Sequence, residues 1–170
     1  MEFQKVVLRR RMVRHFSRRP VPAATVNRML DLARHAPSAG FSQGTAFVVV
    51  TRPGTRRRLA KVQGEEGYRA AGFHPWISEA PVNVVACVSE KLYHDRYNEP
   101  DKLRDGKEID WPTPYWFFDV GAACMVVLLA AVDAGLAAPS QGRSTWRGCA
   151  PPSGFRSTST PSASSPSGDP

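Results

Sequence analysis

Hydrophobic positions recur at two different spacings along the chain, and the spacings predict both helices and strands. Apolar side chains fall three and four residues apart around residues 3–10 and over residues 25–35, which is typical of amphipathic helices. Residues 46–51 and 82–88 are short runs rich in β-branched side chains, which predict two buried strands. The pattern therefore indicates an α+β fold.

The most apolar stretch follows Asp119 and predicts a helix over residues 120–136, with Asp119 at its start. Residues 120–132 are thirteen positions without a charge, fewer than the roughly 20 that span a bilayer. We therefore expect a central core helix and no membrane partner. Gly121 and the two alanines after it would allow another backbone to approach closely.

The segments between these elements are polar. The Arg52–Thr55 segment reads as a turn, with Thr55 as the cap of a following helix that carries Arg56–Arg58 on a solvated face. Residues 64–72 are polar and rich in glycine. Residues 89–114 are charged and read as a long loop, and the aromatic side chains within it favour an ordered loop that packs over something.

Charge is concentrated at the beginning of the chain. The net charge is +8 over 170 residues, and residues 1–20 carry seven Lys or Arg against one acid. A basic face of this kind leaves nucleic-acid binding as an alternative function, although residues 21–138 are neutral, and no recognisable reading helix or aromatic RNA platform supports it. The preferred interpretation has no nucleic-acid partner.

The cysteines and histidines predict no metal site. Cys87, Cys124 and Cys149 lie far apart, and the four histidines share no spacing, so neither set matches metal-ligand or redox motifs. Cys87 and Cys124 are expected to be small buried hydrophobic residues. A sparse, odd number of cysteines and the lack of a secretory signal pattern predict a cytoplasmic protein.

The length predicts one domain, at residues 1–138, followed by a tail of different composition. Residues 139–170 hold nine Ser and six Pro, which is typical of disorder. The abrupt change near Ala138 leads to the hypothesis that the reading frame slips there, leaving the domain truncated at its C-terminus. The alternative is a genuine flexible tail.

Candidate chemistry lies in two segments. Residues 9–16 (RRRMVRHF) hold four arginines within six positions, mixed with apolar side chains that could anchor them. Anchored guanidinium groups bind phosphate or carboxylate oxygens in pairs, although a solvated basic patch is the alternative. If the segment is helical, Arg10 and Arg14 share a face and Arg11 lies on another. Residues 36–44 (APSAGFSQG) form a loop that offers backbone amides, hydroxyls and one amide side chain.

These motifs carry a family resemblance. The order RRxVRxF, a helix, APSAGxSQ and an apolar strand, followed by WPTPYWFFD at residues 111–119, resembles the nitroreductase family of FMN-dependent oxidoreductases. The resemblance covers residues 3 to about 137. It implies a three-layer α+β sandwich with a central antiparallel-type sheet and a long apolar core helix. It also implies an intertwined homodimer with FMN at the subunit interface.

The resemblance further implies which residues contact FMN: Arg10, Arg11, Met12, Arg14, Pro37, Ser38, Ala39 and Gln43. Arg10 would bind the phosphate, and Arg11 and Met12 would contact the phosphate or ribityl chain partly through their backbone. Arg14 would lie near the N1 and C2 carbonyl edge of the flavin, where a positive charge stabilises the reduced cofactor. The Pro37–Ala39 segment would approach from the other subunit.

The implied reaction is ping-pong electron transfer from NAD(P)H through flavin to a nitroaromatic, quinone or similar conjugated acceptor. The chain departs from the family pattern at three places: Met12 stands where Ser is frequent, Phe41 where Asn is frequent, and Gly44-Thr45 replaces Pro-Trp after Gln43. Two alternatives stay open beside this reading, a flavin-binding module without turnover and an inactive truncated remnant. The sequence does not identify the electron acceptor or separate NADH from NADPH.

Overall fold

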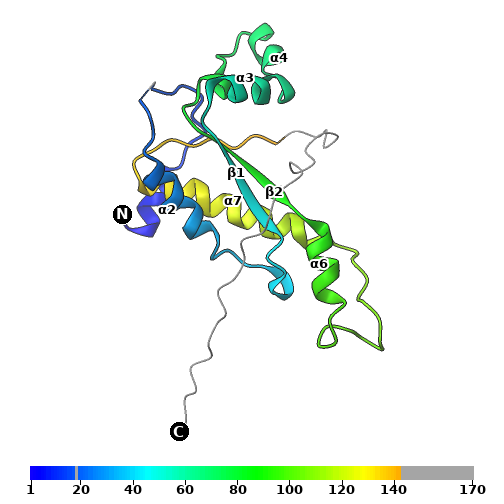
Figure 1. The fold of residues 1–170 in the computed structure, drawn as a ribbon. Helices are drawn as coiled ribbons and strands as arrows, with labels where there is room; N and C mark the ends of the chain where they lie inside the picture. The colour runs from blue at the N-terminus through cyan, green and yellow to red at the C-terminus, as the bar shows by residue number, and fades with distance from the viewer. Residues whose placement is uncertain (18, 143–170) are drawn as a thin grey trace.

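A computed structural model describes residues 1–17 and 19–142, and its centre is a two-stranded sheet packed on one long helix (Figure 1). Strands β1 (Thr45–Val50) and β2 (Asn83–Val88) pair antiparallel, with Thr45 opposite Val88 and Val50 opposite Asn83. Both strands were predicted. They were expected to be buried, however, and all six residues of β2 keep partial exposure.

Helix α7 (Tyr115–Asp133) is the central helix, and it begins four residues before Asp119. The prediction that Asp119 opens this helix is therefore wrong. Asp119 instead belongs to the buried face of α7, which packs on the sheet and on α2 (Ala23–Ala33); its members are Trp116, Asp119, Ala123, Val127, Leu128, Ala130 and Ala131. Met29 and Ala33 of α2 complete this core.

Part of the opposite face of α7 is exposed in the single chain. Phe117, Phe118 and Met125 keep 48%, 67% and 47% of their surface accessible. By length and composition alone, α7 is the one helix in the described residues that could cross a bilayer, since it is 19 residues long and mostly apolar. Its packing on α2 and both strands fits the expected core helix equally well.

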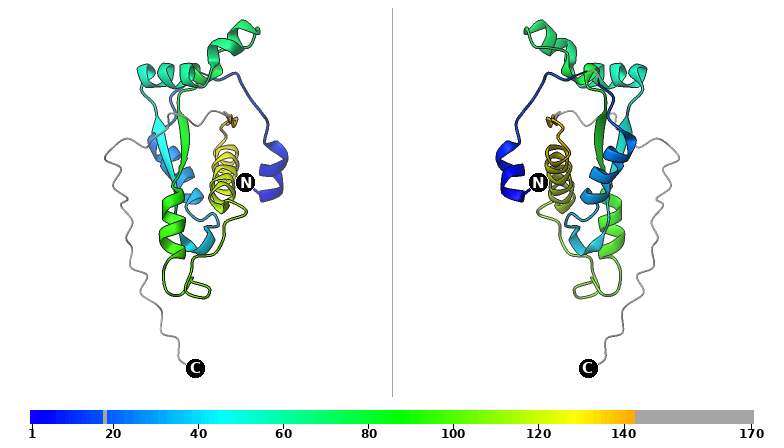
Figure 2. Two further views of the ribbon diagram at one scale, coloured as in Figure 1. Left: turned by 90° about the vertical axis from the view of Figure 1, so that its right-hand side faces the viewer. Right: turned by 90° about the vertical axis from the view of Figure 1, so that its left-hand side faces the viewer.

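Helix α1 (Phe3–Arg9) packs on α7 from the side away from the sheet (Figure 2). Only Val6 is buried in α1, so this helix is held by a narrow contact. After Arg9 the chain loses helical conformation, and the described residues up to Pro22 form no regular element. Arg10 and Arg14 therefore do not share a helical face.

Three short helices gather at one end of the sheet: α3 (Pro53–Val62), α4 (Glu65–Ala70) and α5 (Trp76–Glu79) (Figure 1). Thr55 does not cap α3, because Pro53, whose fixed φ suits a first helical turn, already starts it. Residues 65–70, read from sequence only as polar, form α4. The Glu65 carboxylate is buried there and accepts the N–H groups of Ile77 and Ser78 at 2.6 and 2.9 Å, which caps α5.

Helix α6 (Glu90–Tyr97) lies at the other end of the sheet and corrects the expectation of a loop over residues 89–114. The helix buries one residue, Tyr93, and its exposed side carries i,i+4 charge pairs such as Lys91–Asp95 at 2.5 Å. After α6 the chain turns through a tight hairpin closed by Arg104 and Lys107, with the left-handed residues Asp105 and Gly106 at its tip. Trp111 of this segment packs edge-on against Tyr97 at 4.6 Å, in line with the expected ordered loop.

The predicted tail lies almost wholly outside the described residues. Only residues 139–142 of the 139–170 segment are described, so its disorder and the reading-frame hypothesis stay predictions.

Candidate cofactor-binding site

The Ser38–Gly44 loop is held by hydrogen bonds from both its own residues and α7. The Asp119 carboxylate accepts the backbone N–H of Ala39 at 2.7 Å. Ser42 Oγ donates to the carbonyl of Ala39 at 2.7 Å, and Ser38 Oγ accepts the backbone N–H of Gln43 at 2.8 Å. Gln43 thus helps to hold the loop through its backbone, while its side chain, one of the predicted FMN contacts, is exposed.

Helix α6 closes on the same loop from the other side. Arg96 Nε donates to the carbonyl of Gly40 at 2.9 Å. A Cβ atom on Gly40 would lie 2.5 Å from the Tyr97 ring, and one on Gly44 would lie 2.4 Å from the Tyr93 ring. Both positions therefore require glycine, because α6 approaches the loop too closely for a side chain.

The loop backbone is strained at its tip. Gly40, Phe41 and Gln43 all have left-handed backbone angles, with φ of 59°, 60° and 54°. A bulky residue such as Phe41 pays about 1–3 kcal/mol for this conformation, and it persists only where the surrounding contacts over-determine it. Here the contacts from Asp119 and Arg96 do so. The loop consequently presents Phe41, 77% exposed, to the outside of the chain.

Asp119 links the loop to the core through a second hydrogen bond. Its Oδ2 atom also accepts the Tyr93 hydroxyl at 2.7 Å, and Tyr93 is completely buried. Burial and the neighbouring Asp119 carboxylate raise the pKa of Tyr93 well above its usual value of 10.0, so the hydroxyl stays a donor. Asp119, Tyr93 and Arg96 were not identified from the sequence as part of the site. A lone carboxylate in an otherwise apolar helix was the available signal.

The arginine segment is arranged differently from the prediction. The Arg11 guanidinium donates to the carbonyls of Leu8 and Arg10 at 2.5 and 2.9 Å, which satisfies the C-terminal end of α1. Arg14 lies over the Trp76 ring at 5.9 Å, and Phe16 packs on the core of the α3–α5 region. The segment is thus anchored at both ends rather than free.

The charges of this segment remain available. In the described residues, none of Arg10, Arg11 and Arg14 forms an ion pair with a carboxylate, and Arg10 is half-buried beside α1. Met12 is exposed. Guanidinium groups without acidic partners are the donor set that a phosphate group requires, so the chemistry of the segment fits the phosphate of FMN.

The two predicted halves of the site do not meet within one chain. In Figures 1 and 2, helix α1 and the start of the arginine segment lie on one side of α7, and the Ser38–Gly44 loop lies near α6 on the other. The structure therefore brings Pro37, Ser38, Ala39 and Gln43 together in one place. It places Arg10–Arg14 in another.

A comparison with known protein families identifies the family of the chain. The sequence model of the nitroreductase family matches residues 7–144 of the chain. The chain belongs to the nitroreductase family. The match begins close to the predicted start of the resemblance and runs a few residues past its predicted end near 137.

Curated relatives are longer proteins. Iodotyrosine deiodinase 1 of Pongo abelii is 31% identical over 153 residues, which covers 79% of this chain and 49% of the relative. A putative NADH dehydrogenase/NAD(P)H nitroreductase of Methanothermobacter thermautotrophicus is 26% identical and covers 89% and 63%. The chain thus spans about half to two thirds of the length of these relatives.

Solved structures support the nitroreductase-like α+β fold. Iodotyrosine deiodinase bound to FMN and 3-iodo-L-tyrosine aligns with a TM-score of 0.63 at 18% identity, covering 85% of this chain and 77% of that one. NfrA1 of B. megaterium aligns with a TM-score of 0.62 at 20% identity, covering 81% of this chain and 53% of that one. The predicted fold class, with its long apolar helix and small antiparallel sheet, is confirmed.

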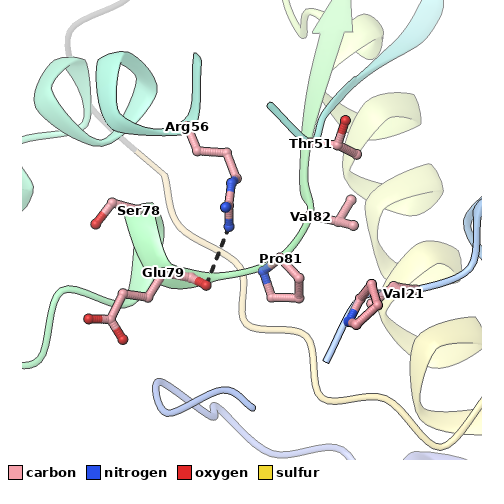
Figure 3. A pocket seen from close by; sticks show the side chains of 8 residues that line it. Val21, Thr51, Arg56, Ser78, Glu79, Pro81 and Val82 are labelled. Atoms are coloured by element: carbon pink, nitrogen blue, oxygen red, sulfur yellow. Dashed lines mark hydrogen bonds between the residues drawn. The ribbon is translucent and has the colours of Figure 1, made fainter. Parts of the chain in front are cut away.

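Other features of the described residues lie apart from the predicted FMN contacts of this nitroreductase-family chain. A cavity of about 540 Å³ beside the α3–α5 region contains none of the predicted FMN contacts (Figure 3). Arg56 lines it and donates to the carbonyls of Glu79 and Ala80, so its expected place on a solvated face is wrong. Within the described residues no cluster of three His, Cys, Asp or Glu could hold a metal ion. Cys87 and Cys124 are half-buried rather than buried, and burial raises the pKa of the Cys124 thiol.

Proposed function

We propose that this protein is an FMN-dependent oxidoreductase that passes electrons from NAD(P)H to a conjugated acceptor such as a nitroaromatic or a quinone. The observation that carries the proposal is the strained Ser38–Gly44 loop. Strain held in place by Asp119, Tyr93 and Arg96 is typical of a ligand site. The loop lies at the sequence motif that the family resemblance assigns to flavin binding.

Different residues of the chain would contact different parts of FMN. When bound, FMN supplies the redox chemistry. Arg10 has no acidic partner among the described residues and would bind the phosphate. Arg14, fixed over Trp76, would place its charge at the N1 and C2 carbonyl edge of the flavin. Because the Arg11 side chain is committed to carbonyls of α1, Arg11 would contact the cofactor through its backbone, as would Met12.

Two copies of the chain would complete the site. The start of the arginine segment and the Ser38–Gly44 loop lie on different sides of α7, so a cofactor that touches both needs loop residues from a partner. The exposed face of α7 offers an apolar surface for that partner, since Phe118 and Met125 are seven residues apart on one side of the helix. The proposed enzyme is therefore a cytoplasmic homodimer that works by a ping-pong reaction.

Reductive deiodination is a second candidate, favoured by the iodotyrosine deiodinases among the relatives. In that reaction a carbon–iodine bond breaks, two electrons and a proton replace the iodine, and iodide leaves. Release of iodide from 3-iodotyrosine with a chemical reductant would support it. Oxidation of NAD(P)H by quinones without iodide release would favour the first candidate.

The binding half of the proposal is tested with Arg14→Ala and the exposed Arg57→Ala as its charge-matched control. FMN is titrated into flavin-free protein, and its fluorescence quenching gives Kd. We expect Arg14→Ala to weaken FMN binding at least about tenfold, the usual effect of losing one charge-assisted contact, and Arg57→Ala to leave Kd unchanged. Equal Kd for both variants and the original chain would exclude the role given to Arg14.

Two other results would favour the alternative functions. Retained FMN without NAD(P)H oxidation would indicate a flavin-binding module without turnover. Strongly salt-dependent DNA or RNA binding would favour the nucleic-acid alternative.

A further inference from the structure

A second cavity, of about 470 Å³, lies between the end of α6, the hairpin that follows it and the first turn of α7. Figure 1 shows this region below α6, at the opposite end of the sheet from α3. Its walls combine two aromatic rings, Tyr97 and Tyr115, with the apolar side chain of Ile109 and the cations Lys102 and Arg104. This volume is within the usual range for small-molecule sites, roughly 300–1,000 Å³.

The walls of this cavity are fixed by contacts on both sides. Arg96 binds Asp101 through two hydrogen bonds of 2.8 Å each, which ties the start of the hairpin to α6. Glu108 accepts hydrogen bonds from His94 Nδ1 at 2.6 Å and Asn98 Nδ2 at 2.7 Å, which ties the end of the hairpin to the same helix. The hairpin is thus clamped at two points.

The aromatic walls are also braced from behind. Trp111 packs edge-on against Tyr97 at 4.6 Å and against Tyr115 at 6.3 Å. The Trp111 indole N–H donates to Glu108 at 2.6 Å, so the ring cannot rotate freely. Two tyrosine rings held around one tryptophan form a surface on which a flat ring can stack.

The charge inside the cavity is positive. Asp101 is the acidic residue in the lining, and its carboxylate is occupied by Arg96, which lowers the pKa of Asp101 to about 2. Lys102 and Arg104 form no ion pair with a carboxylate among the described residues. Lys102 Nζ lies over the Tyr97 ring at 5.7 Å, so this cation lies at the aromatic wall of the cavity.

We propose that this cavity binds an aromatic carboxylate, with Lys102 and Arg104 on the carboxylate and the Tyr97 and Tyr115 rings against the aromatic ring. Guanidinium and ammonium groups on a hydrogen-bonded frame select anions over neutral analogues. The Tyr97 ring also meets Gly40 of the strained loop. The same proposal makes the bound carboxylate the electron acceptor, an assignment that rests on the proposed function.

Calorimetric titration of the purified full chain with 4-nitrobenzoate and with its neutral analogue 4-nitrobenzamide tests the site directly. We expect 4-nitrobenzoate to bind about tenfold more tightly at low salt, the gain typical of one charge-assisted contact. The double variant Lys102→Gln/Arg104→Gln is expected to lose this preference and keep its affinity for the amide. Lys107→Gln, in the same hairpin and outside the cavity lining, is the matched control and should keep the preference.

Equal affinity of the original chain for the two compounds would overturn the proposal without any variant. A preference that survives in the double variant would overturn the proposal as well, since residues other than Lys102 and Arg104 would then bind the carboxylate. The titration measures binding and not turnover, so the two proposals can fail separately. If the chain holds no flavin but still prefers the carboxylate, the proposed function is contradicted and the carboxylate site is supported. A flavin-loaded chain without the preference would contradict this site alone.

Discussion

The Tyr93 hydroxyl donates a 2.7 Å hydrogen bond to the Asp119 carboxylate, and this buried contact joins α6 to α7. The same carboxylate oxygen accepts the N–H of Ala39, so one side chain fixes a helix and a loop. Removing the carboxylate in Asp119→Ala takes this acceptor away from the buried Tyr93 hydroxyl and from the half-buried Ala39 N–H. We expect this variant to lower the free energy of unfolding by about 2–5 kcal/mol, measured by urea denaturation.

Tyr93→Phe tests the same contact from the other side and should cost about 1–3 kcal/mol, because Asp119 keeps its bond to Ala39. Tyr68→Phe is the control, since that ring is 37% exposed and packs edge-on against Phe73 and Trp76. An Asp119→Ala variant as stable as the original chain would contradict the central place given to this carboxylate.

Gly44 is predicted to resist any side chain. An added Cβ would lie 2.4 Å from the buried Tyr93 ring and 3.0 Å from the carbonyl oxygen of Ser89, so neither neighbour can move freely. Gly44→Ala should destabilise the fold by about 1–3 kcal/mol through overpacking. Gly54→Ala, in α3 with open space around it, should instead stabilise by up to about 1 kcal/mol. Equal Tm shifts in the two variants would show that α6 does not press on the loop.

The elements that local periodicity defines were predictable from sequence, and those that depend on distant partners were not. The helix around residues 25–35 and both strands follow from the spacing of apolar side chains. Helix α6 was missed because it buries only Tyr93 and otherwise carries charged and polar residues, which read as a loop. Its helical form is stabilised by pairing with residues outside it and by packing on the loop.

The segments of the candidate site were predictable from the sequence, but the residues that hold those segments in place were not. Both the arginine segment and the 36–44 loop were identified from motifs. The role of Asp119 depends on donors that lie 26 and 80 residues away in the sequence, and no local pattern marks such a contact. The commitment of Arg11 to the carbonyls of α1 likewise depends on where the helix ends, which is at Arg9.

Acidity is predicted to control the clamp that His94 and Glu108 form over residues 98–111. The hydrogen bond to Glu108 raises the pKa of His94 above 6.5, so its contribution to stability is complete below pH 6.5 and is lost as pH rises through the raised pKa. The hydrogen bond from Trp111, followed by that from His94, lowers the pKa of Glu108 below 4.5. That contribution is complete above pH 4.5 and is lost as pH falls through the lowered pKa.

The clamp should therefore be strongest between about pH 4.5 and 6.5. The measurement is Tm against pH for the original chain and for His94→Gln. Their difference is expected to be largest inside this window and to shrink at higher pH, while the exposed His35→Gln control follows the original chain throughout. A constant difference from pH 5 to 9 would show that the charged histidine adds nothing.

Self-association is predicted to use the exposed face of α7. Phe118→Glu places a charge on a residue that is 67% exposed in the single chain, so folding should change little. Burial of that charge in a dimer would be costly, and we expect at least a tenfold weaker dimer by sedimentation equilibrium. Phe73→Glu, 56% exposed and away from α7, is the control. An unchanged dimer constant in Phe118→Glu would place the partner on another surface.

Flavin content tests the central claim most directly. The visible absorption spectrum of gently purified protein is recorded, and an aliquot is denatured to quantify released cofactor. The account predicts flavin absorption with FMN close to one per chain, and release of FMN on denaturation. Folded protein that contains no flavin and takes up none when FMN is added would contradict the account.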